Sequence, residues 1–213
     1  IFFQVFGKKF LIKMGDKDNK LRWANYRKAN DNSPEVRKSE LDLMLKRVNP
    51  RDGEIILECG TGNGYLTFPI AKKVRKGGQV ITYDIIEENL KSVRIKNKDK
   101  KLPIKVKKQK LSYKFNEESN FFDKIISIAA FHHYDNLLEK TGFSGRLRAL
   151  GEFNRILKKK GKLIIGDVGE GMVSAKYFKT IDSAKYCSPS GHPHDFPTKK
   201  EIKNILKKTG FKL

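Results

Sequence analysis

One short stretch, residues 55–65, constrains this chain more than any other. It reads Ile-Ile-Leu-Glu-Cys-Gly-Thr-Gly-Asn-Gly-Tyr, an apolar run that ends in an acid and continues into three glycines at alternate positions. An apolar helical pattern begins directly afterwards. This order predicts a strand, a tight glycine-rich turn and a helix, which together open an α/β nucleotide-binding unit. A ligand would lie beyond the carboxyl end of the strand, where open α/β sheets bind their ligands.

The residues around the turn discriminate between nucleotide ligands. Tyr65 stands where a dinucleotide fingerprint has its third glycine, and no lysine follows Gly64 as in a phosphate-binding P-loop. The Glu58 carboxylate beside the turn would repel a pyrophosphate and attract a cation. The next predicted strand, residues 79–83, ends at Asp84, which is placed to hold ribose hydroxyls. These features together favour S-adenosylmethionine over NAD.

Several stretches of the chain, in this order, resemble class I S-adenosylmethionine-dependent methyltransferases. They are residues 58–64 with Asp84, residues 122–127, residues 157–165 and residues 205–211. The resemblance implies an α/β, Rossmann-like methyltransferase fold: a mostly parallel central sheet with helices on both faces and extra N-terminal helices. It divides the chain into an N-terminal helical extension or lid, residues 1–49, and a cofactor-binding methyltransferase domain, residues 50–213. The final strands of this fold would follow Phe211, so we expect them to be missing or to lie outside this sequence.

Periodicity and capping signals place the other elements. We expect helices over residues 34–48 (with Ser33 as N-cap), 87–95, 146–157 and 199–209 (with Thr198 as N-cap), and strands over residues 104–108, 122–128 and 162–167.

The resemblance also implies which residues contact the cofactor. They are Glu58, Gly60, Thr61, Gly62, Gly64, Asp84, Ile85, Gln109 and Ala129. Members of the class often carry an acid after the third strand, where it bonds the adenine amino group. Gln109 stands near that place in this chain, and its carbonyl oxygen can accept the same bond. The cluster His192-Pro193-His194-Asp195 could be a metal site, but two histidines and one acid are too few ligands to specify one, so we expect no metal.

Two adjacent histidines, His132 and His133, are the candidate catalytic residues, because they follow the fourth strand at the edge expected to face the transferable methyl group. An imidazole titrates near neutral pH and can take a proton from a phenol, hydroxyl or amine. The alternative is that they only form part of the cofactor wall, as in many small-molecule members of the class.

Five further residues are candidate contacts for the methyl acceptor. They are Trp23, Tyr26, Asp167, His192 and His194. The first two belong to a basic, aromatic helical segment, and the alternative for them is ordinary packing, since aromatic side chains bury much area. For the other three the alternative is a solvated loop or a capped turn before the last helix.

The net charge of +22 fits attraction to a polyanion such as RNA, and equally a lysine-biased composition spread over a solvated surface. Residues 129–131 read Ala-Ala-Phe where enzymes that methylate exocyclic base amines carry Asn/Asp-Pro-Pro-aromatic. We therefore predict a methyltransferase acting on a small-molecule acceptor. The alternatives are an RNA (tRNA or rRNA) methyltransferase, or a catalytically silent methyltransferase-like binding subunit.

Cysteine content and hydropathy indicate the cellular compartment that we expect for the chain. Its two cysteines suggest no disulfide framework, and no apolar run reaches the length of a membrane span. We therefore expect no membrane partner and take a reducing, cytoplasmic compartment as the default. The sequence leaves the oligomeric state open.

Overall fold

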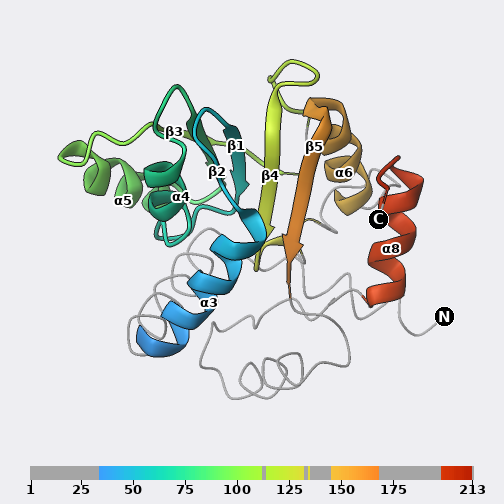
Figure 1. The fold of residues 1–213 in the computed structure, drawn as a ribbon. Helices are drawn as coiled ribbons and strands as arrows, with labels where there is room; N and C mark the ends of the chain where they lie inside the picture. The colour runs from blue at the N-terminus through green and yellow to red at the C-terminus, as the bar shows by residue number, and fades with distance from the viewer. Residues whose placement is uncertain (1–33, 112–113, 132–133, 135–144, 168–197, 213) are drawn as a thin grey trace.

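Five parallel strands form one sheet in the order β3-β2-β1-β4-β5 (Figure 1). This computed structural model describes residues 34–111, 114–131, 134, 145–167 and 198–212. The strands are β1 (Ile55–Cys59), β2 (Gln79–Asp84), β3 (Ile104–Lys108), β4 (Phe122–Ile128) and β5 (Leu157–Gly166). The architecture confirms the predicted Rossmann-like class, and it brings the ends of β1 and β2 side by side.

Helices cover both faces of the sheet. The described helices are α3 (Pro34–Val48), α4 (Thr67–Lys73), α5 (Glu87–Lys98), α6 (Gly145–Ile156) and α8 (Lys199–Lys208). Successive strand side chains point to opposite faces. Accordingly, Ile56 of β1 packs in a cluster with Ile70 of α4, whereas Leu57 packs in a second cluster with Phe153 of α6. Within the described residues, no helix has the length and apolar character that crossing a membrane requires.

The element boundaries follow the predictions except where polar residues extend an element. β5 begins at Leu157, not at residue 162, because Leu157 pairs with Phe122 ahead of an irregularity in the ladder. Helix α5 continues to Lys98, beyond the predicted end at residue 95, because its last residues are polar and do not extend the apolar helical pattern. The predicted Thr198 cap is confirmed: its hydroxyl accepts a bond from the Glu201 amide at 3.1 Å, and Glu201 reciprocates. Ser33 lies outside the described residues.

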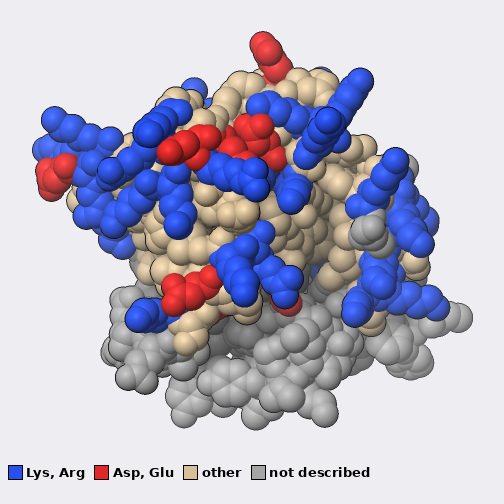
Figure 2. All heavy atoms as spheres, in the orientation of Figure 1, with Lys and Arg blue, Asp and Glu red and all other residues tan. Residues whose placement is uncertain are grey.

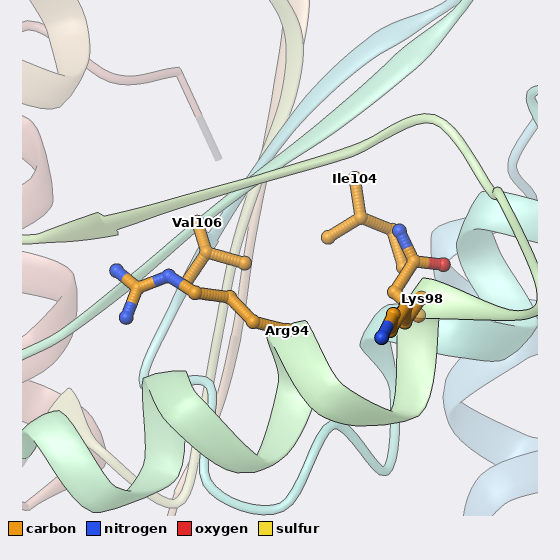
Figure 3. Close-up of a pocket in the computed structure, with 5 residues that line it drawn as sticks. Arg94, Lys98, Ile104 and Val106 are labelled. Atoms are coloured by element: carbon orange, nitrogen blue, oxygen red, sulfur yellow. The ribbon is translucent and has the colours of Figure 1, made fainter.

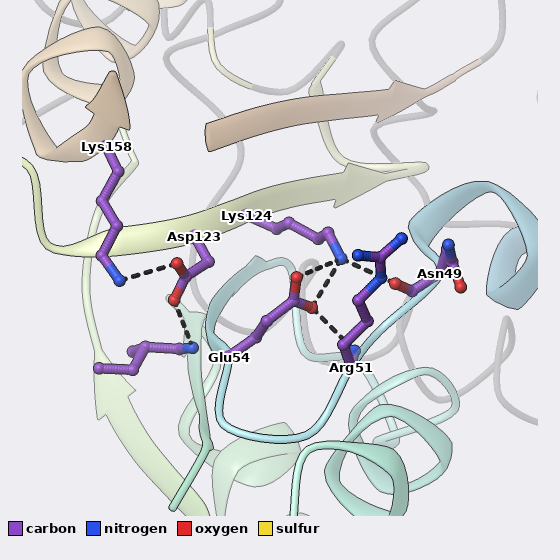
Figure 4. Close-up of polar contacts among 7 residues, drawn as sticks. Asn49, Arg51, Glu54, Asp123, Lys124 and Lys158 are labelled. Carbon is purple, nitrogen blue, oxygen red and sulfur yellow. Dashed lines mark hydrogen bonds and ion pairs between the residues drawn. The ribbon is translucent and has the colours of Figure 1, made fainter. Parts of the chain in front are cut away.

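The amino ends of β1 and β4 are fastened by a polar cluster (Figure 4). Lys124 donates to the Glu54 carboxylate at 2.6 and 2.7 Å and to the Asn49 carbonyl at 2.7 Å. Asp123 accepts from the Ile55 amide and from Lys158. This edge is opposite the glycine-rich turn, so these charges stabilise the sheet and take no part in the candidate site.

Candidate cofactor-binding site

The glycine-rich turn is fastened to the end of β2. The Gly60 and Thr61 amides both donate to the Tyr83 carbonyl, at 2.8 and 3.1 Å. Gly60 has φ +92°, and a Cβ there would lie 2.7 Å from the Ala130 Cβ, so no side chain fits. Gly62 has φ +52°, but a Cβ on it would meet nothing within 4 Å. The backbone at Gly62 therefore faces open space, as a turn that receives a ligand must.

Asp84 is held beside this turn by several donors. Its Oδ2 accepts from the Gly62 amide at 3.0 Å and from Asn89 Nδ2 at 3.1 Å, and its Oδ1 accepts from the Ile86 amide at 2.9 Å. Burial raises the pKa of Asp84 above its ordinary value, and these hydrogen bonds oppose the rise. Oδ2 already accepts two bonds, so Oδ1 is the oxygen with lone-pair capacity for a further donor. A fixed carboxylate next to an open turn can thus accept a bond from a ribose hydroxyl.

Glu58 lies beneath the turn and is 3% exposed. Its Oε2 accepts from the hydroxyls of Thr67 at 2.5 Å and Thr82 at 2.7 Å, and the Thr61 hydroxyl bonds in turn to Thr82. Burial raises the pKa of Glu58 to about 7, against the opposing effect of the two threonine bonds. Near neutral pH this carboxyl group is therefore partly ionised, so it places a partial negative charge directly beneath the glycine-rich turn.

The remaining predicted cofactor residues have different surroundings. Ile85 is 50% exposed and offers an apolar surface directly after Asp84. The Gln109 amide donates to the Asp84 carbonyl at 3.1 Å, while its side chain donates to the Lys110 carbonyl at 3.0 Å. A Cβ on Gly64 would lie 2.6 Å from the Phe68 ring, so Gly64 lets the turn pack on α4.

The segment after β4 is anchored in the core on both sides of the two candidate histidines. Phe131 and Tyr134 are buried, and the Tyr134 amide donates to the Phe131 carbonyl at 3.1 Å. The Tyr134 hydroxyl bonds to Ser127 Oγ at 2.8 Å, and burial raises the pKa of this tyrosine well above its ordinary value. Ala129 has φ +51°, and its amide donates to the Gly166 carbonyl at 2.7 Å.

Six of the predicted site residues lie outside the described residues. They are Trp23, Tyr26, His132, His133, His192 and His194. Asp167 follows β5 and contributes to the raised pKa of Tyr134, which puts it near the segment after β4. In the part of the chain that the structure describes, no group of three His, Cys, Asp or Glu side chains is arranged to hold a metal ion.

Some site residues were missed by sequence reasoning. Thr82 shares a strand face with Asp84, since alternate residues of a strand point the same way, and that alternation could have identified it. Thr67 and Asn89 carry no comparable signal, because their roles depend on contacts between elements.

Asn89 is the residue that we expect to position Asp84. It is fully buried, its Nδ2 donates to the Asp84 carboxylate, and among the described residues its own Oδ1 has no hydrogen-bond partner. Asn89→Leu removes this donor, which we expect to weaken cofactor affinity by about threefold to tenfold, less than the loss of a direct hydrogen bond to the cofactor, because Asn89 acts through Asp84. It should also raise the pH at which affinity is lost on acidification, because a less supported carboxylate protonates more readily. Calorimetric titration across a pH series measures both effects.

Asn97→Leu is the matched control on the same helix. Asn97 bonds the Leu102 amide and carbonyl, at 3.1 and 3.0 Å, away from the turn. It should lower stability without changing cofactor affinity or its pH profile. Equal effects of the two substitutions on affinity would contradict a positioning role for Asn89.

The family comparison agrees with these features, which are the sheet order, the glycine-rich turn and the acid at the end of β2. Residues 50–210 match the family described as "Methyltransferase domain". The chain belongs to this family. Its fold is the Rossmann-like fold of S-adenosylmethionine-dependent methyltransferases, as the sequence resemblance predicted.

The chain resembles both curated sequences and solved structures. It is 42% identical over 55 residues to a tRNA (adenine(57)-N(1)/adenine(58)-N(1))-methyltransferase of Methanocaldococcus jannaschii, covering 26% of this chain and 20% of that protein. A structure of a SAM-dependent methyltransferase from Aquifex aeolicus has a TM-score of 0.64 and 24% identity, covering 89% of this chain and 88% of that one. A putative sarcosine dimethylglycine methyltransferase of Galdieria sulphuraria has a TM-score of 0.57 and 23% identity, covering 86% and 63%.

The sequence matches extend over limited parts of the relatives. The chain spans 20% to 46% of the lengths of the curated relatives that it matches first. The structural matches show the shared fold. The reaction and the acceptor therefore have to be argued from the residues of this chain.

The residues present fit S-adenosylmethionine. Open space stands in front of Gly62, a fixed carboxylate at Asp84 lies beside it, and an exposed apolar side chain, Ile85, follows. Glu58 adds negative charge below the turn, which suits a donor that carries a sulfonium and an ammonium group. Within the described part of the chain, Lys96 donates to the Asn63 carbonyl of the turn at 3.1 Å, and in the sequence no lysine follows the last glycine as in a P-loop.

Proposed function

We propose that this methyltransferase transfers the methyl group of S-adenosylmethionine to a small-molecule acceptor. The observation that carries the proposal is the Asp84 carboxylate fixed at the Gly62 amide, beside open space at the carboxyl ends of β1 and β2. When bound, the cofactor supplies an already activated methyl group. The protein then has to orient the acceptor and exclude water, and it needs a base only where the attacking atom loses a proton.

The chain's own residues divide this work. Asp84 and the glycine-rich turn hold the methyl donor, and Glu58 supplies negative charge beneath the turn. Ile85 forms an apolar wall of the cofactor site, and Gln109 and Ala129 line its sides. His132 and His133 are the proposed proton acceptors. Their neighbours in the sequence, Phe131 and Tyr134, are buried in the core, which supports a place for this part of the chain close to the glycine-rich turn. The proposed acceptor contacts are Trp23, Tyr26, Asp167, His192 and His194.

Two observations support a small acceptor. The segment after β4 carries Ala129 and Ala130 in place of the Asn/Asp-Pro-Pro-aromatic motif of enzymes that methylate exocyclic base amines. The Galdieria protein, which resembles this chain over most of its length, is named for a small-molecule acceptor.

RNA methylation is the second candidate. It is favoured by the basic excess and by the short match to a tRNA methyltransferase of Methanocaldococcus jannaschii. Salt separates the two candidates, because binding to phosphates weakens steeply with added salt and binding of an uncharged acceptor does not. Transfer of a labelled methyl group to a panel of small amines, phenols and hydroxy compounds, compared with transfer to total tRNA and rRNA, tests the proposal. Label on RNA alone would replace it.

His133→Ala should lower turnover by at least about tenfold and change cofactor affinity little, since a general base acts in the transition state. His132→Ala applies the same test to the other candidate proton acceptor. Single-turnover methyl transfer and cofactor titration measure the two quantities separately. Loss of affinity with unchanged turnover would make these histidines part of the cofactor wall.

A further inference from the structure

A groove on the outer edge of the sheet lies apart from the glycine-rich turn. It is formed between α5 and the edge strand β3, with a volume of about 230 Å³, and it is lined by Arg94, Asn97, Lys98, Ile104 and Val106. Figure 3 shows Arg94 and Lys98 extending from α5 near the side chains of Ile104 and Val106. The groove thus combines an apolar floor from β3 with a cationic rim from α5.

Positive charge is concentrated around this groove. Residues 87–110 contain ten Lys or Arg and three Asp or Glu, a net charge of +7 out of +22 for the whole chain. Lys91, Arg94 and Lys98 are exposed and share one face of α5, since they are three and four residues apart. Figure 2 shows the basic side chains gathered over α5 and β3. The charge of the chain is therefore partly focused, not evenly spread.

The cations of the rim are available to an anionic ligand. Arg94 pairs with Glu87 at 2.6 Å, but both side chains are partly exposed, and such pairs are weak and exchange readily. Among the described residues, Lys98 forms no ion pair. Like charges on one helix face repel each other, and a phosphate placed between them would relieve that repulsion.

We propose that the α5–β3 groove binds a segment of single-stranded RNA. The apolar floor and the Arg94 guanidinium suit the face of an unpaired base, and Lys91 and Lys98 suit the adjoining phosphates. A duplex hides its base faces, so an apolar floor favours a single strand. The inference goes beyond the proposed methyl transfer: RNA in this groove is a substrate if RNA is methylated, and a separately bound partner if the acceptor is a small molecule.

The test is binding of a fluorescein-labelled oligouridylate of about ten nucleotides, followed by anisotropy over a salt series. The Lys91→Gln/Lys98→Gln variant, which removes the two proposed phosphate contacts, should bind about tenfold more weakly at low salt. Its slope of log affinity against log salt should fall by about 1.4, because each phosphate contact on a single strand contributes about 0.7. Val106→Thr should weaken binding without changing the slope, since it alters only the floor.

Lys159→Gln/Lys160→Gln is the matched control, with the same loss of charge at exposed positions of β5, at the far edge of the sheet. It should change affinity less than twofold. Equal losses in the two double variants would overturn the proposal in favour of diffuse attraction, and equally tight binding of polyglutamate would overturn it in favour of an acidic protein partner. Cofactor binding by each variant, measured by calorimetry, tests the proposed methyl transfer independently, so a failure of RNA binding can be told apart from a failure of that proposal.

Discussion

Replacing Asp84 by alanine is expected to lower affinity for S-adenosylmethionine by about tenfold to a hundredfold. A carboxylate that accepts a ribose hydroxyl contributes a hydrogen bond to a charged group, worth about 1.5–3 kcal/mol. The same substitution removes the acceptor of the Gly62 and Ile86 amides and of Asn89 Nδ2. Buried donors without a partner cost about 1–3 kcal/mol each, so the turn should also loosen. Isothermal titration with the cofactor and chemical unfolding measure the two effects.

Asp84→Asn separates binding from folding. The amide retains one acceptor oxygen and the shape of the side chain, so it should destabilise the fold less than alanine while still losing most of the affinity. Asp99→Asn is the control, because Asp99 is exposed at the far end of α5 and should change neither quantity. If Asp84→Asn bound the cofactor as well as the unaltered protein, the assignment of the ribose acid would be wrong.

The parts of this fold that sequence predicted best are those set by local pattern. The strand predicted over residues 122–128 has those bounds, and the apolar run that opens residues 55–65 forms β1, because strands buried on both faces are largely apolar. The Thr198 cap was equally visible, since its partner Glu201 is three residues away. The identity of the nucleotide depended on single residues, Tyr65 and Glu58, at fixed places around the turn.

What the sequence did not reveal depends on contacts between distant residues. Thr82 reaches Glu58 across 24 positions, and Asn89 reaches Asp84 only because α5 folds back on β2. The surroundings of Glu58 changed its interpretation most. As a residue beside the turn it was expected to attract an ammonium group directly, but it is buried under the turn and bonded by two threonines. A direct contact with the cofactor remains a prediction; an effect of its charge on the stability of the site is testable now.

Replacing Glu58 by glutamine should abolish a pH-dependent part of the stability of the protein. The pKa of Glu58 rises from 4.5 to about 7 on folding, so the folded state holds this proton more tightly than the unfolded chain. The resulting stabilisation is fully present below pH 4.5, falls as pH rises and is lost above about pH 7. The difference corresponds to about 3 kcal/mol. Between pH 5 and pH 8, the unaltered protein should therefore lose more stability than Glu58→Gln.

The difference between the two unfolding free energies isolates this effect, because every other titrating group is common to both proteins. Glutamine can still accept the Thr67 and Thr82 hydroxyl bonds through its carbonyl oxygen, so the variant should fold and should be the more stable of the two at pH 8. A cofactor with positive charge favours ionised Glu58, so its binding should lower this pKa and release protons near pH 7 from the unaltered protein alone. Parallel stability curves for the two proteins would show that Glu58 ionises in the folded state as it does in water, and that burial beneath the turn leaves its charge unperturbed.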